Sequence, residues 1–136
     1  IWGRPDMLIL KLLKTDYENK NFKLNNGGDH FRDFTSINDV NNISLKLIRK
    51  KINKNIILNI SSNKPIYIKK LIKKIKLFKK KLKIKNINKN KADVYKTHGD
   101  NKLLYKFIGY KINRKFDKDL SEIVEWFDSI KKYKFF

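Results

Sequence analysis

A segment of mixed composition, GDHFRDFTSINDV (residues 28–40), interrupts a chain that is otherwise rich in lysine, asparagine and isoleucine. It places Arg32 between the aromatic Phe31 and the acidic Asp33. A planar guanidinium binds phosphate oxygens through two parallel hydrogen bonds, which a lysine ammonium cannot do. Arg32 is therefore a candidate anion-binding residue. The alternative is a strand arginine that pairs with Asp29 or Asp33.

Arginine is rare among the cationic residues of this chain. The 34 Lys and Arg residues outnumber the 13 Asp and Glu residues, for a net charge of +21, and arginine stands only at positions 4, 32, 49 and 114. Such a charge attracts polyanions, nucleic acid first of all. The lysines, however, are spread over most of the chain, as expected when an AT-rich coding sequence drifts. We interpret the charge as a general bias and do not expect nucleic acid as a partner. A stand-alone basic module that binds nucleic acid or an anionic surface is the alternative.

Other chemistries find less support in the sequence. There is no cysteine, so neither disulfides nor thiolate metal sites are available. His30 and His98 have no partners at a spacing that indicates metal binding or acid–base catalysis. No apolar run approaches the ~20 residues that span a bilayer, and the start, IWGRPDMLIL, lacks the features of a secretory signal. We therefore expect a cytoplasmic protein without a membrane partner or a metal.

Helices and strands are predicted to alternate along the chain. Apolar residues recur at spacings of three and four, which predicts helices at 6–18, 37–50, 66–81, 101–108 and 117–133. Strands are predicted at 21–24, 30–35, 55–60 and 82–87, with an Asn-Asn-Gly-Gly turn at 25–28. Asn38 is expected to cap the second helix and Gly109 to stop the fourth. The alternation favours an α/β fold in a single domain.

The densest run of lysines falls within one of these helices. In KKLIKKIKLFKKKLKIK (residues 69–85) the apolar residues keep helical spacing and the lysines fill the other positions. This pattern is first of all that of a solvated helix face. A helix that lies on a membrane surface or on nucleic acid is the second interpretation.

Five segments occur in an order and spacing that resemble a known family. They are WGRPDM, GDHFRDFTSINDV, ILNISSNKPIYI, ADVYKTHGD and LLYKFIGYKINRKFDKDLSEIVEWF. Together they resemble the extended short-chain dehydrogenase/reductases, the NAD-dependent nucleotide-sugar epimerases and dehydratases, and most of all the UDP-glucuronate 4-epimerase branch. The resemblance covers residues 1–136 and matches the C-terminal portion of those enzymes. It implies an α/β substrate-binding portion of a Rossmann-type fold, an incomplete domain without the N-terminal dinucleotide-binding half.

The chemistry of that family needs residues that this chain lacks. The five glycines, at 3, 27, 28, 99 and 109, form no glycine-rich NAD turn, and none of the six tyrosines has a lysine four residues on. The resemblance therefore implies that NAD and the Tyr-x-x-x-Lys pair belong to a missing N-terminal Rossmann half. It implies no catalytic, cofactor-binding or metal residue here, and a chain that is inactive alone. The intact enzyme would be a homodimeric isomerase that interconverts the C4 configuration of a UDP-sugar.

The resemblance also assigns roles in substrate binding. Arg32 would reach the diphosphate of the UDP-sugar, and Asp93 would bond the ribose hydroxyls. Arg4, in WGRPDM, would face the nucleotide pocket. The uracil edge would meet backbone groups of a strand formed by Phe22, Lys23 and Leu24.

Three positions depart from the pattern of the family. Asn90 stands where some relatives carry a phosphate-binding arginine, and Lys89 or Lys91 would substitute there as a point charge. Ser61 stands where glycine is usual, and Gly99 stands where alanine is usual. These differences affect the geometry of the loops around the expected site.

Overall fold

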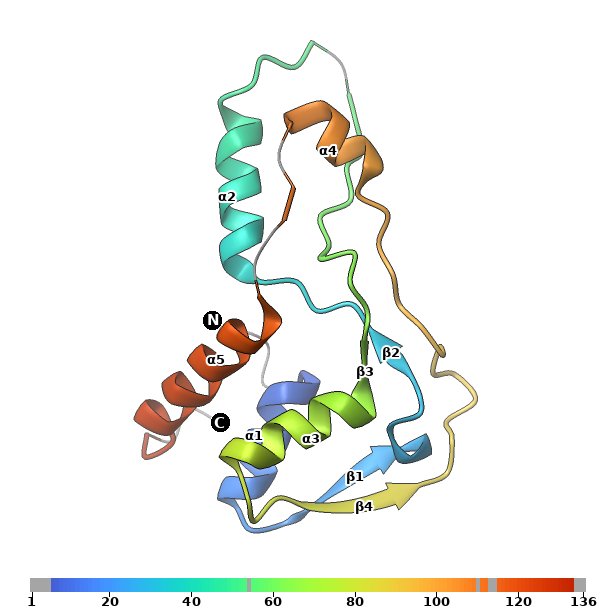
Figure 1. The fold of residues 1–136 in the computed structure, drawn as a ribbon, viewed down its shortest axis with the longest axis vertical. Coiled ribbons are helices and arrows are strands. Elements are labelled where there is room, and N and C mark those ends of the chain that lie inside the picture. The colour runs from blue at the N-terminus through green and yellow to red at the C-terminus, as the bar shows by residue number, and fades with distance from the viewer. Residues whose placement is uncertain (1–5, 54, 110, 113–114, 134–136) are drawn as a thin grey trace.

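Helices and strands alternate along the chain in the computed structural model, which describes residues 6–53, 55–109, 111–112 and 115–133 (Figure 1). The elements are, in order, α1 (Leu8–Tyr17), β1 (Asn21–Asn25), the 3-10 turn η1 (Asn26–Gly28), β2 (Phe31–Arg32), α2 (Ile37–Ile48), β3 (Ile66–Tyr67), α3 (Ile68–Phe78), β4 (Lys83–Ile87), α4 (Lys102–Ile108) and α5 (Phe116–Ile130). The predicted α/β class is confirmed.

Two short sheets connect segments that are distant in sequence. β1 pairs with β4 in parallel, with Asn21 opposite Lys83. A parallel pair needs a crossover connection, and the chain between these strands, which includes α3, supplies it. β2 pairs with β3 antiparallel, with Phe31 opposite Tyr67 and Arg32 opposite Ile66. The two sheets therefore hold both ends of the segment 21–32, which contains the predicted substrate-binding residues Phe22, Lys23, Leu24 and Arg32.

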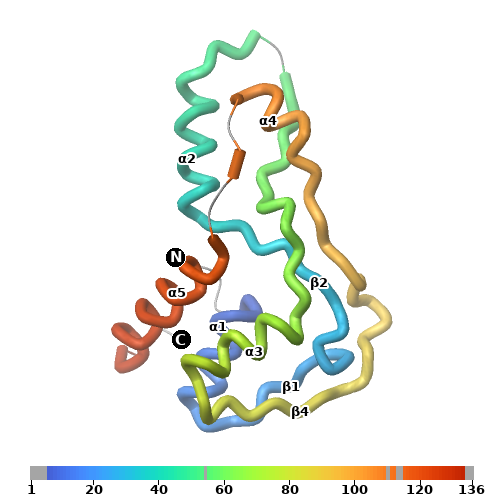
Figure 2. The backbone as a smooth tube through the Cα atoms, in the orientation of Figure 1, coloured from blue at the N-terminus to red at the C-terminus, as the bar shows by residue number. Residues whose placement is uncertain are grey.

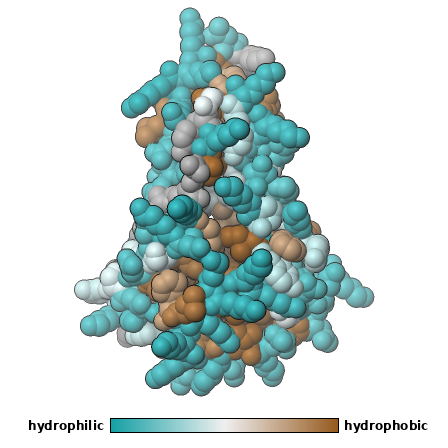
Figure 3. All heavy atoms as spheres, in the orientation of Figure 1, coloured by the Kyte–Doolittle hydropathy of each residue, from teal (hydrophilic) through white to brown (hydrophobic). Residues whose placement is uncertain are grey.

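The larger of two hydrophobic cores lies between α1, α3, α5 and β1. Each helix buries one apolar stripe, and in α3 the stripe consists of Ile68, Leu71, Ile72 and Ile75. Four lysines of α3, at 69, 70, 73 and 76, are exposed on the opposite side. The solvated lysine face is therefore confirmed, and Figure 3 shows hydrophilic side chains over most of the visible surface.

A smaller core holds the other end of the molecule, where α2 and α4 lie (Figure 2). Three side chains are buried there, those of Ile43, Leu104 and Ile112. Leu58 and Ile60 are partly buried against them. The segment that contains these two residues runs beside the chain that enters α4, because Asn59 Nδ2 donates a hydrogen bond to the carbonyl of Asp100.

The prediction of a strand at 55–60 is wrong. These residues form no strand, since their backbone pairs with none of the described strands. Ile57 is 90% exposed, whereas Leu58 and Ile60 turn inwards. An apolar run is compatible with a buried strand, but a strand forms only where a neighbouring strand accepts its hydrogen bonds.

Other boundaries differ from the sequence prediction by a few residues. α2 begins at Ile37, so Asn38 lies inside the helix and does not cap it. Ile48, expected on the inner face of this helix, is 79% exposed. The segment 30–35, predicted to be extended, contains only a two-residue strand, and β3 precedes α3 where a continuous helix was expected. Gly109 ends α4 with a φ of +65°, as predicted, because the left-handed conformation suits glycine.

Candidate functional site

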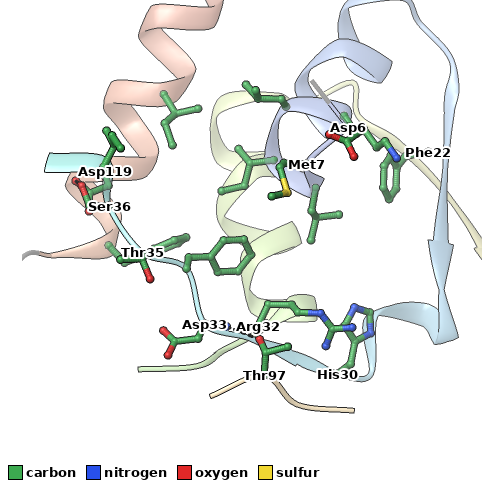
Figure 4. Close-up of a pocket in the computed structure, with 18 of the residues that line it drawn as sticks. Asp6, Met7, Phe22, His30, Arg32, Asp33, Thr35, Ser36, Thr97 and Asp119 are labelled. Carbon is green, nitrogen blue, oxygen red and sulfur yellow. Dashed lines mark hydrogen bonds between the residues drawn. The ribbon is translucent and has the colours of Figure 1, made fainter. Parts of the chain in front are cut away.

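A cavity of about 830 Å³ lies between the start of α1, β1, β2 with the residues that follow it, and the start of α5 (Figure 4). Its size is typical of small-molecule sites, which measure roughly 300–1,000 Å³. Five of the predicted substrate-binding residues line it, namely Phe22, Lys23, Leu24, Arg32 and Asp93. The sixth, Arg4, lies outside the described residues.

The short strand β2 positions Arg32 by anchoring its neighbour. The ring of Phe31 packs against the rings of Tyr67 and Tyr95, with centroids 4.9 and 5.8 Å away. The backbone of Phe31 also pairs with residues 95–97, through hydrogen bonds to the Tyr95 carbonyl and from the Thr97 amide. Successive side chains of a strand point to opposite faces, so the anchored Phe31 leaves Arg32 directed towards the cavity.

Arg32 forms an ion pair with Asp93, 61 residues further along the chain. Nη2 of Arg32 contacts Oδ1 of Asp93, and Nη1 donates to the carbonyl of Phe31 at 2.7 Å. The two charged side chains are 22% and 30% exposed. Among the described residues, Arg32 therefore pairs with Asp93 and not with Asp29 or Asp33. Arginine has five N–H donors, so donors remain for an anionic ligand.

Asn25, at the end of β1, fixes the other side of Asp93. Its Nδ2 donates to Oδ2 of Asp93, and its Oδ1 accepts the backbone N–H of Asn90 at 2.8 Å. One asparagine thus holds the segment 90–93 against β1. The sequence places Asn25 in a predicted turn, and nothing in the local pattern indicates a partner 68 positions away.

Asp33 organises the loops next to Arg32. Its carboxylate accepts hydrogen bonds from the Ser62 hydroxyl and from the backbone N–H groups of Asn63 and Gly99, the latter two at 3.1 Å. Its own N–H donates to Oγ1 of Thr97 at 3.0 Å. Asp33 therefore connects three loop segments at the end of β2.

Ser61 and Gly99, two of the three positions that depart from the family pattern, lie so close together that side chains at both would overlap. A Cβ atom placed on Gly99 would lie 2.5 Å from Cβ of Ser61 and would overlap its Oγ. The Ser61 hydroxyl instead donates to Oδ1 of Asn101 at 2.9 Å. The serine therefore fits only because residue 99 has no side chain.

His30 is a polar side chain buried at the wall of the cavity. It is 8% exposed, and its Nδ1 has no hydrogen-bond partner among the described residues. In Figure 4 its ring lies next to the Arg32 guanidinium. Burial lowers the pKa of His30, and the positive charge of Arg32 lowers it further, against the opposing effects of Asp93 and Asp29. Sequence analysis assigned no role to this histidine.

The charge of the cavity wall differs from that of the chain as a whole. Among the described residues that line it, acidic side chains outnumber lysine and arginine by five to three. The acids are Asp6, Asp33, Asp93, Asp119 and Glu122, and the cations are Lys11, Lys23 and Arg32. The cavity is therefore not an extension of the lysine-rich surface, and the few cations in it are specific features.

Neither a cluster of metal ligands nor a glycine-rich turn that opens a helix occurs among the described residues. No group of three or more potential metal ligands occurs among them. Gly27 and Gly28 adopt positive φ angles in η1, but this turn leads into β2 and not into a helix N-terminus, where a dinucleotide pyrophosphate binds. None of the described helices has the length and apolar character needed to cross a bilayer.

Comparison with known proteins identifies relatives that are longer than this chain. No protein-family model matches it. The UDP-glucuronate 4-epimerase of Thermodesulfobacterium geofontis is 33% identical over 129 residues, which are 91% of this chain and 38% of that protein. An uncharacterized protein of Methanocaldococcus jannaschii, MJ1055, is 33% identical over 127 residues, 93% of this chain and 39% of its own length. The chain thus spans less than half of the curated relatives that it matches.

Solved structures share the fold. The UDP-glucuronic acid 4-epimerase from Bacillus cereus, in complex with UDP-glucuronic acid and NAD, matches with a TM-score of 0.81 and 21% identity, over 94% of this chain and 41% of that one. MoeE5 in complex with UDP-glucuronic acid and NAD matches with a TM-score of 0.84 and 19% identity, over 93% and 43%. The chain is an α/β segment homologous to part of the NAD-dependent nucleotide-sugar epimerases and dehydratases.

Proposed function

We propose that this chain is the C-terminal, substrate-binding portion of an NAD-dependent nucleotide-sugar epimerase of the UDP-glucuronate 4-epimerase kind. Its cavity holds the UDP part of the sugar nucleotide. The observation that carries this proposal is the convergence of Arg32 and Asp93, 61 residues apart, on the wall of the cavity that β1 also lines. A guanidinium donates hydrogen bonds to a diphosphate, and a carboxylate accepts them from ribose hydroxyls. The backbone groups at the edge of a strand can bond the edge of a base.

Each of these groups has a defined task in the proposal. Arg32 binds the diphosphate through N–H donors that its contacts with Asp93 and Phe31 leave available. Asp93 accepts hydrogen bonds from the ribose hydroxyls. Among the described strands β1 pairs with β4 alone, so backbone groups of Phe22, Lys23 and Leu24 on its other edge can bond the uracil edge. Arg4, outside the described residues, completes the predicted set.

The rest of the enzyme supplies the chemistry. In this proposal an N-terminal Rossmann half binds NAD through a glycine-rich turn and carries the Tyr-x-x-x-Lys pair. This sequence contains neither the turn nor the pair. The segment alone therefore binds substrate without turning it over. The intact, cytoplasmic protein is a homodimeric isomerase that changes the configuration at C4 of a UDP-sugar.

Calorimetric titration of the 136-residue chain with UDP tests the proposal. We expect saturable binding of UDP and none of free glucuronate, because the contacts are made by the nucleotide end. Arg32→Ala should abolish the binding, whereas Arg49→Ala, at an exposed position on the chain, should leave it unchanged. A folded chain that does not bind UDP contradicts the proposal. An upstream reading frame without a glycine-rich turn and Tyr-x-x-x-Lys contradicts the assignment to an active enzyme.

The stand-alone nucleic-acid module rests on the net charge of +21 alone. It predicts DNA or RNA binding with a defined stoichiometry that survives the loss of Arg32. We expect instead weak binding that disappears near ~150 mM salt, where exposed charges more than about 8 Å apart are screened. UDP binding should persist at that ionic strength, because it takes place in a partly enclosed cavity. Stoichiometric, Arg32-independent DNA binding at 150 mM salt would support the alternative.

A further inference from the structure

His30 is a buried polar group that the proposed contacts leave unused. The side chain is more than nine-tenths buried, lines the cavity and leaves Nδ1 without a hydrogen-bond partner among the described residues. Buried polar atoms in native proteins are nearly always hydrogen-bonded, so an exception calls for a physical explanation. The other histidine, His98, is exposed and contacts Oδ1 of Asn63 through Nε2 at 2.5 Å. The two residues therefore form a natural comparison within one chain.

The surroundings of His30 determine its charge and its proton. Arg32, Asp93 and Asp29 are the charged groups that act on the ring. Burial and the adjacent guanidinium lower its pKa, so the ring is neutral at physiological pH. A neutral imidazole has one N–H and one bare nitrogen. Because buried N–H groups without acceptors are rarer than buried acceptors without donors, the proton belongs on Nε2 and the enclosed Nδ1 is bare.

The backbone around His30 fixes the ring in this position. Its N–H donates to the carbonyl of Gly28 at 2.9 Å, and its carbonyl accepts the N–H of Ile68 at 3.0 Å. His30 lies at a bend directly before β2, two residues from Arg32, and Figure 4 shows its ring next to the Arg32 guanidinium. An oxygen atom bound by Arg32 therefore lies within the neighbourhood of the His30 ring (Figure 4).

We propose that His30 donates its Nε2–H to an oxygen of the ligand's diphosphate, as a second, uncharged donor beside Arg32. This inference rests on the proposed binding of a UDP-sugar in the cavity. The neutral donor adds a hydrogen bond to an anion without placing a second positive charge against Arg32. It also narrows the ligand class, because a nucleoside without phosphates cannot engage His30.

Titration of variants with three probes tests this role. The probes are UDP, uridine and inorganic pyrophosphate, and the variants are His30→Leu, His30→Gln and, as the matched control, His98→Leu. We expect His30→Leu to weaken UDP and pyrophosphate by about tenfold, since a hydrogen bond to a charged group is lost, and to leave uridine unchanged. His30→Gln keeps an N–H donor and should recover part of the affinity. His98→Leu should match the unmodified chain.

The outcomes separate this inference from the proposed function. If the unmodified chain fails to bind UDP, both fail. If UDP binds and His30→Leu, folded by circular dichroism, binds it within twofold of the unmodified chain, only the role of His30 is wrong. An equal loss of affinity for uridine would place His30 on the nucleoside and also contradict the inference.

A spectroscopic measurement on the unmodified chain covers the case in which His30→Leu does not fold. Nitrogen NMR of the imidazole rings reports the tautomer directly, because protonated and bare nitrogens resonate far apart. We expect His30 to carry its proton on Nε2 and this nitrogen to shift on addition of UDP, with no comparable change at His98. A His30 spectrum that is indifferent to bound UDP overturns the inference.

Discussion

The Arg32 guanidinium is oriented before any ligand arrives. Its two contacts, with the Asp93 carboxylate and the Phe31 carbonyl, hold the planar fork at the cavity wall. Asn25 in turn holds Asp93. A side chain whose rotamer is fixed in advance loses less entropy when it binds a ligand. The ion pair is therefore better described as a positioning device than as a source of stability, since partly exposed pairs contribute little.

The fork geometry of Arg32 leads to the first prediction at the scale of single residues. Arg32→Lys keeps the charge but replaces two parallel hydrogen bonds by one point contact. We expect the affinity for UDP to fall by about tenfold or more, as the loss of a charge-assisted hydrogen bond implies. Calorimetry measures the change, with Arg49→Lys as the control. Equal affinity of Arg32→Lys and the unmodified chain would show that only charge matters at this position.

Asp128 gives a prediction about pH. Burial alone would raise its pKa, but hydrogen bonds from Lys131 and Lys79 outweigh this effect and lower the pKa below its usual value. A lowered folded-state pKa stabilises the fold above the unfolded-state pKa, about 3.9, and this stability is lost as the pH falls through the folded value. Urea unfolding should therefore show Asp128→Asn less stable than the unmodified chain at pH 7, with the difference vanishing towards pH 2. A difference that is constant over pH would argue against this mechanism.

Residues of the site were predictable where a motif carried them and not otherwise. Arg32 and Asp93 were found through their place in family-like segments, and the structure brings them together. Asn25 and His30 were missed, and so were the loop contacts of Asp33. The partners of Asn25 and Asp33 lie 29 to 68 positions away in the chain, and the burial of His30 depends on elements that pack around it. No local pattern carries such information.

At the scale of elements, α3 shows how periodicity predicts packing. Ile75 is fully buried in the larger core, whereas Leu77, two residues on, is 76% exposed. Ile75→Ala should reduce the free energy of unfolding by about 2–5 kcal/mol, because it leaves a cavity. Leu77→Ala should change it by no more than about 0.5 kcal/mol. Urea unfolding of the two variants checks the prediction, and equal destabilisation would mean that the helix is rotated about its axis.

The loops that carry Ser61 and Gly99 give a coupled prediction. Gly99→Ala overlaps the Ser61 side chain and should cost about 1–3 kcal/mol, the usual effect of overpacking. Adding Ser61→Gly should recover most of this loss, because it empties the contested space. The free energies of unfolding of the two single variants and the double variant give the coupling energy. Simple additivity would contradict the steric explanation.

The elements themselves differ in how far the sequence determined them. Helices α1, α3 and α5 follow from apolar spacing, and β1 and β4 from short alternating runs. The strand prediction for residues 55–60 was wrong because an apolar run indicates burial but does not indicate a strand that accepts its hydrogen bonds. β3 was missed for the same reason, since its pairing with β2 is a long-range contact. Strands depend on distant segments, and helices do so far less.

At the scale of the whole molecule, the two cores are unequal. Among the described residues, thirteen buried ones form the larger cluster and three form the smaller one. Local stability follows buried apolar contact, so α2 and α4 should open more readily than α1 and α3. Hydrogen–deuterium exchange measured by mass spectrometry should therefore show faster exchange in peptides from α2 and α4. Uniform protection along the chain would mean that both cores unfold as one unit.

Three exposed apolar side chains lie in α2 and in the segment that follows it, near the smaller core. Leu45, Ile48 and Ile57 are 51%, 79% and 90% exposed. A chain that spans 38 to 43% of its relatives has, in those relatives, further residues against which such side chains can pack.

The shared space of Ser61 and Gly99 also links the residues that these two positions can accept. With serine at 61, any side chain at 99 would meet the Ser61 side chain. Residue 99 can therefore carry a Cβ atom without displacement of its surroundings only when residue 61 is smaller than serine, so exchanges at the two positions depend on each other.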